Sequence, residues 1–119
     1  MRIRQLINLT PHTIYVWSHG EIVLSIPTSD GEARAGGFED YWDDLYVESS
    51  GDKIPLYSWG FGEVTGLPAE RPEVGYIVSR NVAEQIAKQS PGRSDLFVPG
   101  HTVRNAEGVI IGCKCLMRI

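Results

Sequence analysis

The feature that most constrains this chain is a series of short runs of β-branched and aromatic residues, each ended by a turn signal. Runs of this composition favour strands. In the first quarter they cover residues 2–9, 13–17 and 21–27, with turns predicted at Thr10–His12 and Ser18–Gly20. The pattern predicts a first hairpin that continues into a three-stranded meander.

The middle of the chain mixes strand composition with glycines and acidic residues. A short strand is predicted at 32–35, where it carries Arg34, before the flexible pair Gly36–Gly37. Strand composition returns at 45–48 and 53–57, on either side of a strong turn signal. We expect a hairpin of two edge strands there, followed by a proline-broken surface loop over 65–74.

The last third has the clearest local signals. An apolar strand over 75–79 precedes a short helix, for which Asn81 has the spacing of an N-cap and Glu84 that of the third helical position. The helix is expected to end near Gln89. Strands and turns are then expected to alternate to the end of the chain, with strands at 95–98, 101–104 and 109–119 and turns at 99–100 and 105–108.

Together these elements predict a single compact domain over residues 1–119, of the α+β class, with a mostly antiparallel β-sheet and one short helix. The length suits one domain, and the 42% hydrophobic and 22% charged fractions are typical of a globular protein.

Charge and hydropathy limit the partners. The formal net charge is −4, which argues against a surface built to bind duplex nucleic acid. The stretch 1–8 alternates basic and apolar residues without a long apolar run, so neither a secretory signal nor a membrane anchor is expected. We expect a cytoplasmic protein that does not contact membranes.

No metal site, cofactor or catalytic residue is predicted. Cys113 and Cys115 share one face of a strand, but a closed zinc site needs four ligands and the three histidines have no recognisable spacing. Both cysteines are expected to be reduced core residues. No serine lies in a nucleophile elbow. A binding protein is therefore expected rather than an enzyme, although a nucleotide hydrolase or lyase stays open because triads assemble from distant residues.

Two junctions place an arginine beside an amide. Arg80–Asn81 stand where a strand meets the predicted helix, and Arg104–Asn105 stand where a strand meets a turn. A helix N-terminus and a guanidinium together can hold an anionic group, and a guanidinium plane can stack on adenine. The alternative is that both arginines are solvated charges and Asn81 only a cap.

Two aromatic segments have other possible roles. The acidic aromatic run Phe38–Asp44 is predicted to be either a docking patch for a protein or an edge hairpin that covers the core. The segment Trp59–Gly62 is either an aromatic floor under a base or sugar, or a packed turn.

Several motifs resemble a family of small phage and prophage proteins. The residues that carry the likeness are Asn8–His12, Gly66–Pro68, Tyr76–Ser79, Val82–Ala83, Asp95–Leu96, Val98–Gly100, Val103–Arg104 and Gly108–Cys113. The named family that these motifs resemble is that of the Thoeris anti-defence sponges. These bind cyclic ADP-ribose isomers made by bacterial TIR proteins and withhold them from their effector.

The resemblance implies a phage-encoded protein that sequesters a cyclic nucleotide immune signal without cleaving it and works as a homo-oligomer, a dimer or hexamer, in the host bacterial cytoplasm. Pockets shared between subunits would follow. A sponge for cyclic oligonucleotides and a phage structural or protein-interaction module are the alternatives. Combining this implication with the two junctions, we expect the ligand to be bound by Arg34, Tyr76, Arg80, Asn81, Arg104 and Asn105.

Overall fold

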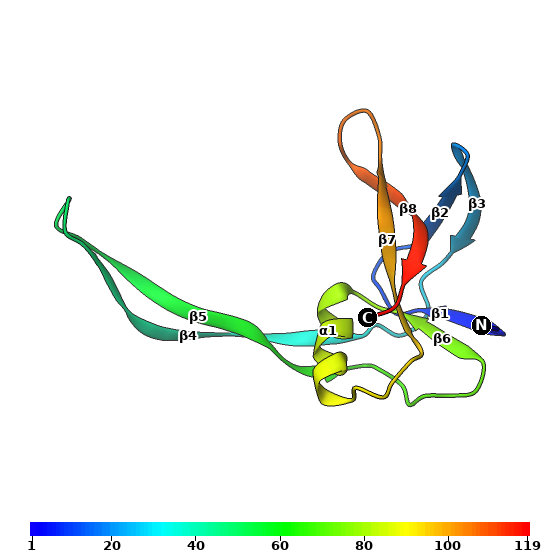
Figure 1. Cartoon of the computed structure of the whole chain (residues 1–119), viewed down its shortest axis with the longest axis horizontal. Helices are drawn as coiled ribbons and strands as arrows, with labels where there is room; N and C mark the ends of the chain where they lie inside the picture. The colour runs from blue at the N-terminus through cyan, green and yellow to red at the C-terminus, as the bar shows by residue number, and fades with distance from the viewer.

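A computed structural model describes all 119 residues, and it divides into a compact body and a projecting arm (Figure 1). The strands of the body are β1 (Gln5–Asn8), β2 (Ile14–Ser18), β3 (Glu21–Ile26), β6 (Val74–Ile77), β7 (Leu96–Arg104) and β8 (Ile110–Met117). The body also holds the single helix α1 (Arg80–Gln89). The arm consists of β4 (Arg34–Val47) and β5 (Asp52–Thr65).

The body strands form one mixed sheet in the order β1-β6-β7-β8-β2-β3. The pairs β1–β6, β6–β7 and β2–β8 are parallel, whereas β2–β3 and β7–β8 are antiparallel. The prediction of a mainly β chain with one short helix is confirmed. The prediction of a mostly antiparallel sheet fits only in part, because three of the body's five strand pairs are parallel.

The expected first hairpin and three-stranded meander are wrong. β2 and β3 do form a hairpin, but β1 pairs with β6, more than sixty residues away, from Gln5↔Val74 to Asn8↔Ile77. A strand's composition favours extended backbone and does not select its neighbour, which depends on packing across the sheet. The buried side chain of Asn8 redirects the chain here. Its amide nitrogen donates to the carbonyls of His12 (2.8 Å) and Ile26 (3.1 Å).

The same asparagine closes the turn that follows β1. Its side-chain oxygen accepts hydrogen bonds from the backbone nitrogen (2.9 Å) and the hydroxyl (2.6 Å) of Thr10. The side chain of Asn8 is fully buried, and each of its polar atoms has a hydrogen-bond partner, as a buried amide requires. The segment Asn8–His12 is therefore a hydrogen-bonded turn that joins the end of β1 to the end of β3.

The core lies between α1 and the sheet. It is built from Leu9, Ala33, Tyr76, Val78, Val82, Ala83, Ile86, Leu96 and Val98. The helix begins at Arg80, and Ser79 rather than Asn81 caps it, accepting a hydrogen bond from the nitrogen of Val82 at 3.3 Å. This register turns Val82, Ala83 and Ile86 toward the core.

β7 belongs to both halves of the sheet. Leu96 and Phe97 pair with β6, and from Val98 onward the strand pairs with β8. The turn predicted at Pro99–Gly100 is wrong, since the strand runs on through Arg104. The turn predicted at 105–108 is present, closed by the hydrogen bond from the nitrogen of Gly108 to the carbonyl of Asn105.

The arm corrects the prediction for the middle of the chain. The hairpin turn lies where it was expected, but each strand has 14 residues rather than four or five, and Gly36–Gly37 lie within β4. The radius of gyration is 18.7 Å, against about 13.5 Å for a compact domain of this length. The difference comes from this arm, which Figure 1 shows extending far from the body.

Candidate functional site

The six predicted ligand residues lie on separate parts of the body and at the arm's root. Arg34 begins β4 and forms an exposed ion pair with Glu32, Nε to Oε1 at 3.0 Å. The hydrogen bond and the negative charge of Glu32 raise the pKa of Arg34 above its already high ordinary value. This guanidinium is already engaged, with a neighbour two residues away.

Tyr76 has no surface to offer a ligand in this structure. Its exposed fraction is 0%, and its hydroxyl contacts Arg71 Nε at 3.2 Å and the carbonyl of Ala69 at 3.4 Å. The Arg93 guanidinium covers the ring, with its central carbon 5.9 Å from the ring centroid. Tyr76 is a core residue, which sequence composition alone did not reveal.

The remaining four residues serve their local elements. Arg80 reaches Glu84 one turn along the helix, Nε to Oε1 at 3.4 Å, and Asn81 is exposed in the first turn. Arg104 donates from Nη1 to the carbonyl of Gly108 at 2.7 Å. The side-chain oxygen of Asn105 accepts from the nitrogens of Glu107 and Val109, both at 3.0 Å, and so builds the β7–β8 turn.

These residues do not meet in one pocket. The five main hollows of the surface are lined by other residues. Figure 1 shows α1 low in the body and the tip of the β7–β8 hairpin at the opposite end. Within one chain, the two arginine–asparagine junctions are therefore not neighbours.

The cysteines differ from each other in environment. Cys113 is buried, with its sulfur 3.7 Å from the carbonyl of Tyr15, whereas Cys115 is half-buried, and both are free thiols. Burial raises the pKa of the Cys113 thiol, with a smaller contribution from the nearby Cys115. The core role predicted for Cys113 is confirmed. No cluster of three or more His, Cys, Asp or Glu side chains is arranged to hold a metal ion.

The arm carries the most unusual surface of the molecule. Cross-strand partners share a face, and alternate residues lie on opposite faces. One face, which we call the aromatic face, is defined by Tyr41, Tyr46, Tyr57, Trp59 and Phe61. The other face, called the second face, carries Phe38, Leu45, Val47, Ile54 and Leu56. A two-stranded ribbon normally has one apolar face, which it buries against a core, whereas this ribbon has two apolar faces.

Edge-to-face packing orders the aromatic face. The ring centroids of Tyr41 and Tyr57 are 5.9 Å apart, and those of Trp59 and Phe61 are also 5.9 Å apart, with nearly perpendicular planes in both pairs. A hydrogen bond to Asp44 raises the pKa of Tyr41. Even so, Trp59 is 72% exposed.

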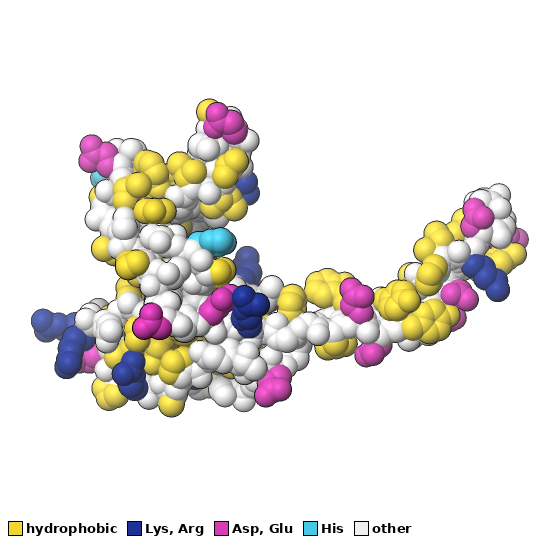
Figure 2. Space-filling view, turned by 180° about the vertical axis from the view of Figure 1, so that it is seen from behind, with side chains coloured by type: hydrophobic (Ala, Val, Ile, Leu, Met, Phe, Trp, Pro, Cys, Tyr) yellow, Lys and Arg dark blue, Asp and Glu magenta, His cyan; other side chains and the backbone are white.

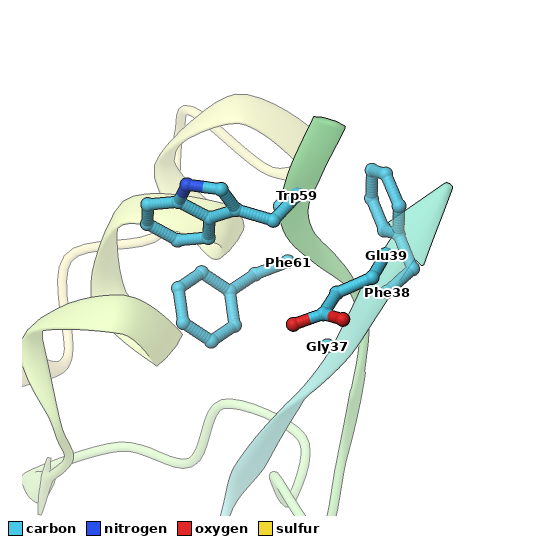
Figure 3. Close-up of a pocket in the computed structure, with 6 residues that line it drawn as sticks. Gly37, Phe38, Glu39, Trp59 and Phe61 are labelled. Carbon is cyan, nitrogen blue, oxygen red and sulfur yellow. The ribbon is translucent and has the colours of Figure 1, made fainter. Parts of the chain in front are cut away.

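Near its root the arm has a hollow of about 350 Å³. Trp59 and Phe61 form one wall, and the Glu39 side chain, whose residue pairs with Trp59 across the strands, extends toward the same space (Figure 3). Phe38 points to the opposite face, where its ring covers Gly60. A Cβ on Gly60 would meet that ring at 2.9 Å.

Negative charge is concentrated on the arm. Between residues 34 and 65 there are seven carboxylates and two cations, a net charge of −5, so the rest of the chain has a net charge of +1. Figure 2 shows acidic and hydrophobic side chains along the arm, and most of the basic side chains on the body.

A second apolar feature lies in the body, between two hairpins. The strand pairing of β2 with β8 is limited to one residue pair, Val16↔Cys113, and the β2–β3 and β7–β8 hairpins splay apart on one side of that contact (Figure 1). The resulting cleft has a volume of about 590 Å³. It is lined by His12, Thr13, Ile14, Tyr15, Pro99, Thr102, Ile110, Ile111, Gly112 and Cys113, with no carboxylate among them.

The sequence singles out one segment in each strand of the arm, Phe38–Asp44 in β4 and Trp59–Gly62 in β5, where the second is strand and not a packed turn. Phe38–Asp44 was interpreted as a docking patch or a core-covering hairpin, and the structure shows that it covers no core. The continuity of the arm was missed because two register shifts, at Ala35/Gly37 and Tyr41/Asp43, interrupt the alternation. The cross-strand partnership of Glu39 with Trp59 has no signal in the sequence.

The single helix of this chain has ten residues, and it lacks the length and hydropathy needed to cross a bilayer. No protein-family model matches the chain, and neither the curated proteins nor the solved structures include a significant match to it.

Proposed function

We propose that this protein is a protein-docking module that acts through the β4–β5 arm. One observation carries the proposal: a 14-residue, two-stranded ribbon with large hydrophobic side chains exposed on both faces. The exposed members are Phe38, Tyr41, Trp42, Leu45, Tyr46, Ile54, Tyr57 and Trp59. Contiguous apolar surface of this kind marks an interaction site, and Trp and Tyr dominate binding energies at such sites.

Stability supports the same proposal. An isolated two-stranded hairpin is marginally stable in water, since neither face is shielded. Here the root is anchored, because Ala35 and Val64 pack against the core, but beyond the root the ribbon projects away from the body (Figure 1). A partner that covers one face would supply the missing burial, which is the reason to regard the arm as a docking element.

Photo-cross-linking tests the proposal directly. A benzophenone amino acid at position 42, where Trp42 is 75% exposed, should give a protein adduct in the cells that express the chain. The double variant Tyr57→Thr/Trp59→Thr should reduce that adduct at least about tenfold, a loss of 1.4 kcal/mol or more in affinity. The same cross-linker at Val23, exposed on the body, is the matched control. An arm that gives no adduct would refute docking.

Sequestration of a cyclic nucleotide signal, such as a cyclic ADP-ribose isomer, is a second candidate. Its support is that Arg34, Arg80 and Arg104 all expose guanidinium groups, the side chains best suited to phosphate. None of the five main hollows of the chain is lined by any of them, so this candidate requires a pocket that a second subunit completes. In this reading the chain blocks a Thoeris effector by withholding its activator, with no bond cleaved.

Calorimetry with cyclic ADP-ribose isomers and with cyclic di- and trinucleotides separates the candidates. Sequestration predicts saturable binding that Arg104→Ala weakens, and release of intact ligand on heating. Cleaved ligand would indicate an enzyme, and the absence of heat for every nucleotide would exclude the sponge. Trp42→Ala should weaken protein docking and leave nucleotide binding unchanged.

A further inference from the structure

The surface of the isolated chain is too large for its mass. A compact monomer of 13.2 kDa exposes about 6,400 Å². This chain exposes 8472 Å², roughly 2,000 Å² more. Two chains that each buried this excess would form an interface of about 4,000 Å², which lies in the range of obligate assemblies and well above that of crystal contacts.

Charge decides which surface could cover the arm. Packing one arm against another would bring together two ribbons of net charge −5 each, whereas the body has a net charge of +1. Like charges juxtaposed across an interface cost binding energy, and opposite charges direct the encounter. The arm is therefore suited to a body surface rather than to another arm.

The apolar cleft between the β2–β3 and β7–β8 hairpins is the body surface that fits. Its volume of about 590 Å³ is in the range of pockets that enclose a drug-sized molecule, enough for more than one aromatic ring. No carboxylate lines it, so the acidic arm would meet no like charge there. Ile110 and Tyr15 are partly exposed beside it, with nothing in the monomer to cover them.

An arm cannot fill the cleft of its own chain. Its root is fixed where Ala35 and Val64 pack into the core, and a 14-residue strand extends for about 46 Å. Figure 1 shows the arm leaving the body sideways, while the two hairpins, whose strands β2, β7 and β8 carry most of the cleft's lining residues, lie at another side of the body. A second chain is needed to bring an arm and a cleft together.

We infer that the arm's partner is a second copy of this chain, and that the aromatic face of one arm binds in the apolar cleft of the other copy. This inference rests on the proposed docking role and specifies its partner. Tyr57 and Trp59 enter the cleft, and Ile110 and Ile111 of the other copy contact them. Each contact joins unlike surfaces, an arm and a cleft. Two copies that exchange arms about a two-fold axis make this contact twice and form a closed dimer, whereas a single head-to-tail contact repeated around an axis forms a ring.

Sedimentation velocity of the full chain, up to about 100 µM, tests the inference, since micromolar association is nearly complete at that concentration. The intact chain should sediment as a dimer or larger closed assembly. Two variants should each weaken association at least about tenfold: Tyr57→Thr/Trp59→Thr in the arm, and Ile110→Asp in the cleft. Val23→Asp, an equally drastic change at another exposed site, should have no effect.

A mixing experiment distinguishes the possible occupants. The arm variant keeps an intact cleft, and the Ile110→Asp variant keeps an intact arm. An equimolar mixture should therefore form hetero-oligomers at a concentration at which each variant alone stays monomeric. Failure of the mixture to associate, with dissociation by the arm variant only, would show that arms pair with arms and would overturn the inference. Circular dichroism of each variant checks that it is folded.

A chain that stays monomeric throughout would also overturn self-association. In that case the cross-linking experiment still decides the docking role. An adduct to a different protein would leave docking intact and assign another partner, whereas the absence of any adduct would remove both proposals.

Discussion

The body and the arm are both built from strands that carry large apolar side chains, yet many of these side chains are buried in the body and most are exposed in the arm. β6 in the body has four residues, three of them buried, whereas β5 in the arm has fourteen and none is buried. β6 lies between two strands and under a helix, while β5 pairs only with β4. An apolar side chain in a strand becomes a core residue only when a second layer covers it.

The two regions should therefore respond differently to the loss of an aromatic side chain. Tyr76→Ala, at a fully buried position, should lower the free energy of unfolding by about 3–5 kcal/mol, because it leaves a cavity in the core. Trp59→Ala should cost less than about 0.5 kcal/mol in the monomer, since this ring is exposed. Urea denaturation of dilute protein measures both. Equal losses would mean that the arm is covered in solution.

Ion pairs give a second contrast. Arg93 Nε lies 2.7 Å from Asp95 Oδ1, and both side chains are largely buried. Arg93→Ala should destabilise the body by about 3 kcal/mol, because it leaves a buried carboxylate without its partner. Arg34→Ala at the arm's root breaks an exposed pair and should leave the denaturation midpoint unchanged within error. A large effect of Arg34→Ala would show that the root is shielded from solvent.

Two glycines test how tightly each region is packed. A Cβ on Gly75 in β6 would meet Phe97 at 2.7 Å and Leu6 at 3.2 Å, so Gly75→Ala should cost about 1–3 kcal/mol through overpacking. A Cβ on Gly60 in the arm would meet only the ring of Phe38, which is exposed and can turn away. Gly60→Ala should therefore cost well under about 1 kcal/mol. The reverse order in thermal unfolding would contradict the contrast.

Thiol reactivity gives the smallest of these contrasts. Burial raises the pKa of Cys113 above its ordinary value of 9.0, and the thiolate is the reacting form. In a Cys115→Ala background, Cys113 should react with iodoacetamide at pH 8 at least about tenfold more slowly than a cysteine introduced as Ser58→Cys on the exposed arm. Its rate should keep rising above pH 9, where the arm cysteine levels off. Equal rates would place Cys113 at the surface.

Several turns and the end of the helix, which depend on neighbouring residues in the sequence, were predicted well. The β4–β5 turn, the 105–108 turn and the end of the helix at Gln89 all lie where the sequence indicated. Predictions that depended on partners failed, as with the meander, because composition does not distinguish a hairpin neighbour from a distant parallel one. The helix cap moved from Asn81 to Ser79 for a smaller reason: both residue types cap well, and core packing fixed the register.

The candidate ligand residues show the same difference between what residue type indicates and what depends on distant parts of the chain. Arg80 and Arg104 are exposed as polar junction residues should be, but Tyr76 is inside the core and Asn105 builds a turn. Residue type alone identified side chains capable of binding a nucleotide. It carried no information on whether they converge, because they come from elements separated along the sheet.

The sequence by itself determined a β-rich chain with one short helix, an acidic aromatic middle and a buried Cys113. Only the tertiary structure decided that this middle projects as an arm with two uncovered faces, and that a cleft free of carboxylates lies between two hairpins. The physical reason is that a strand's alternation specifies which side chains share a face. Whether that face is covered depends on the layer packed against it, which distant parts of the chain, or another chain, must supply.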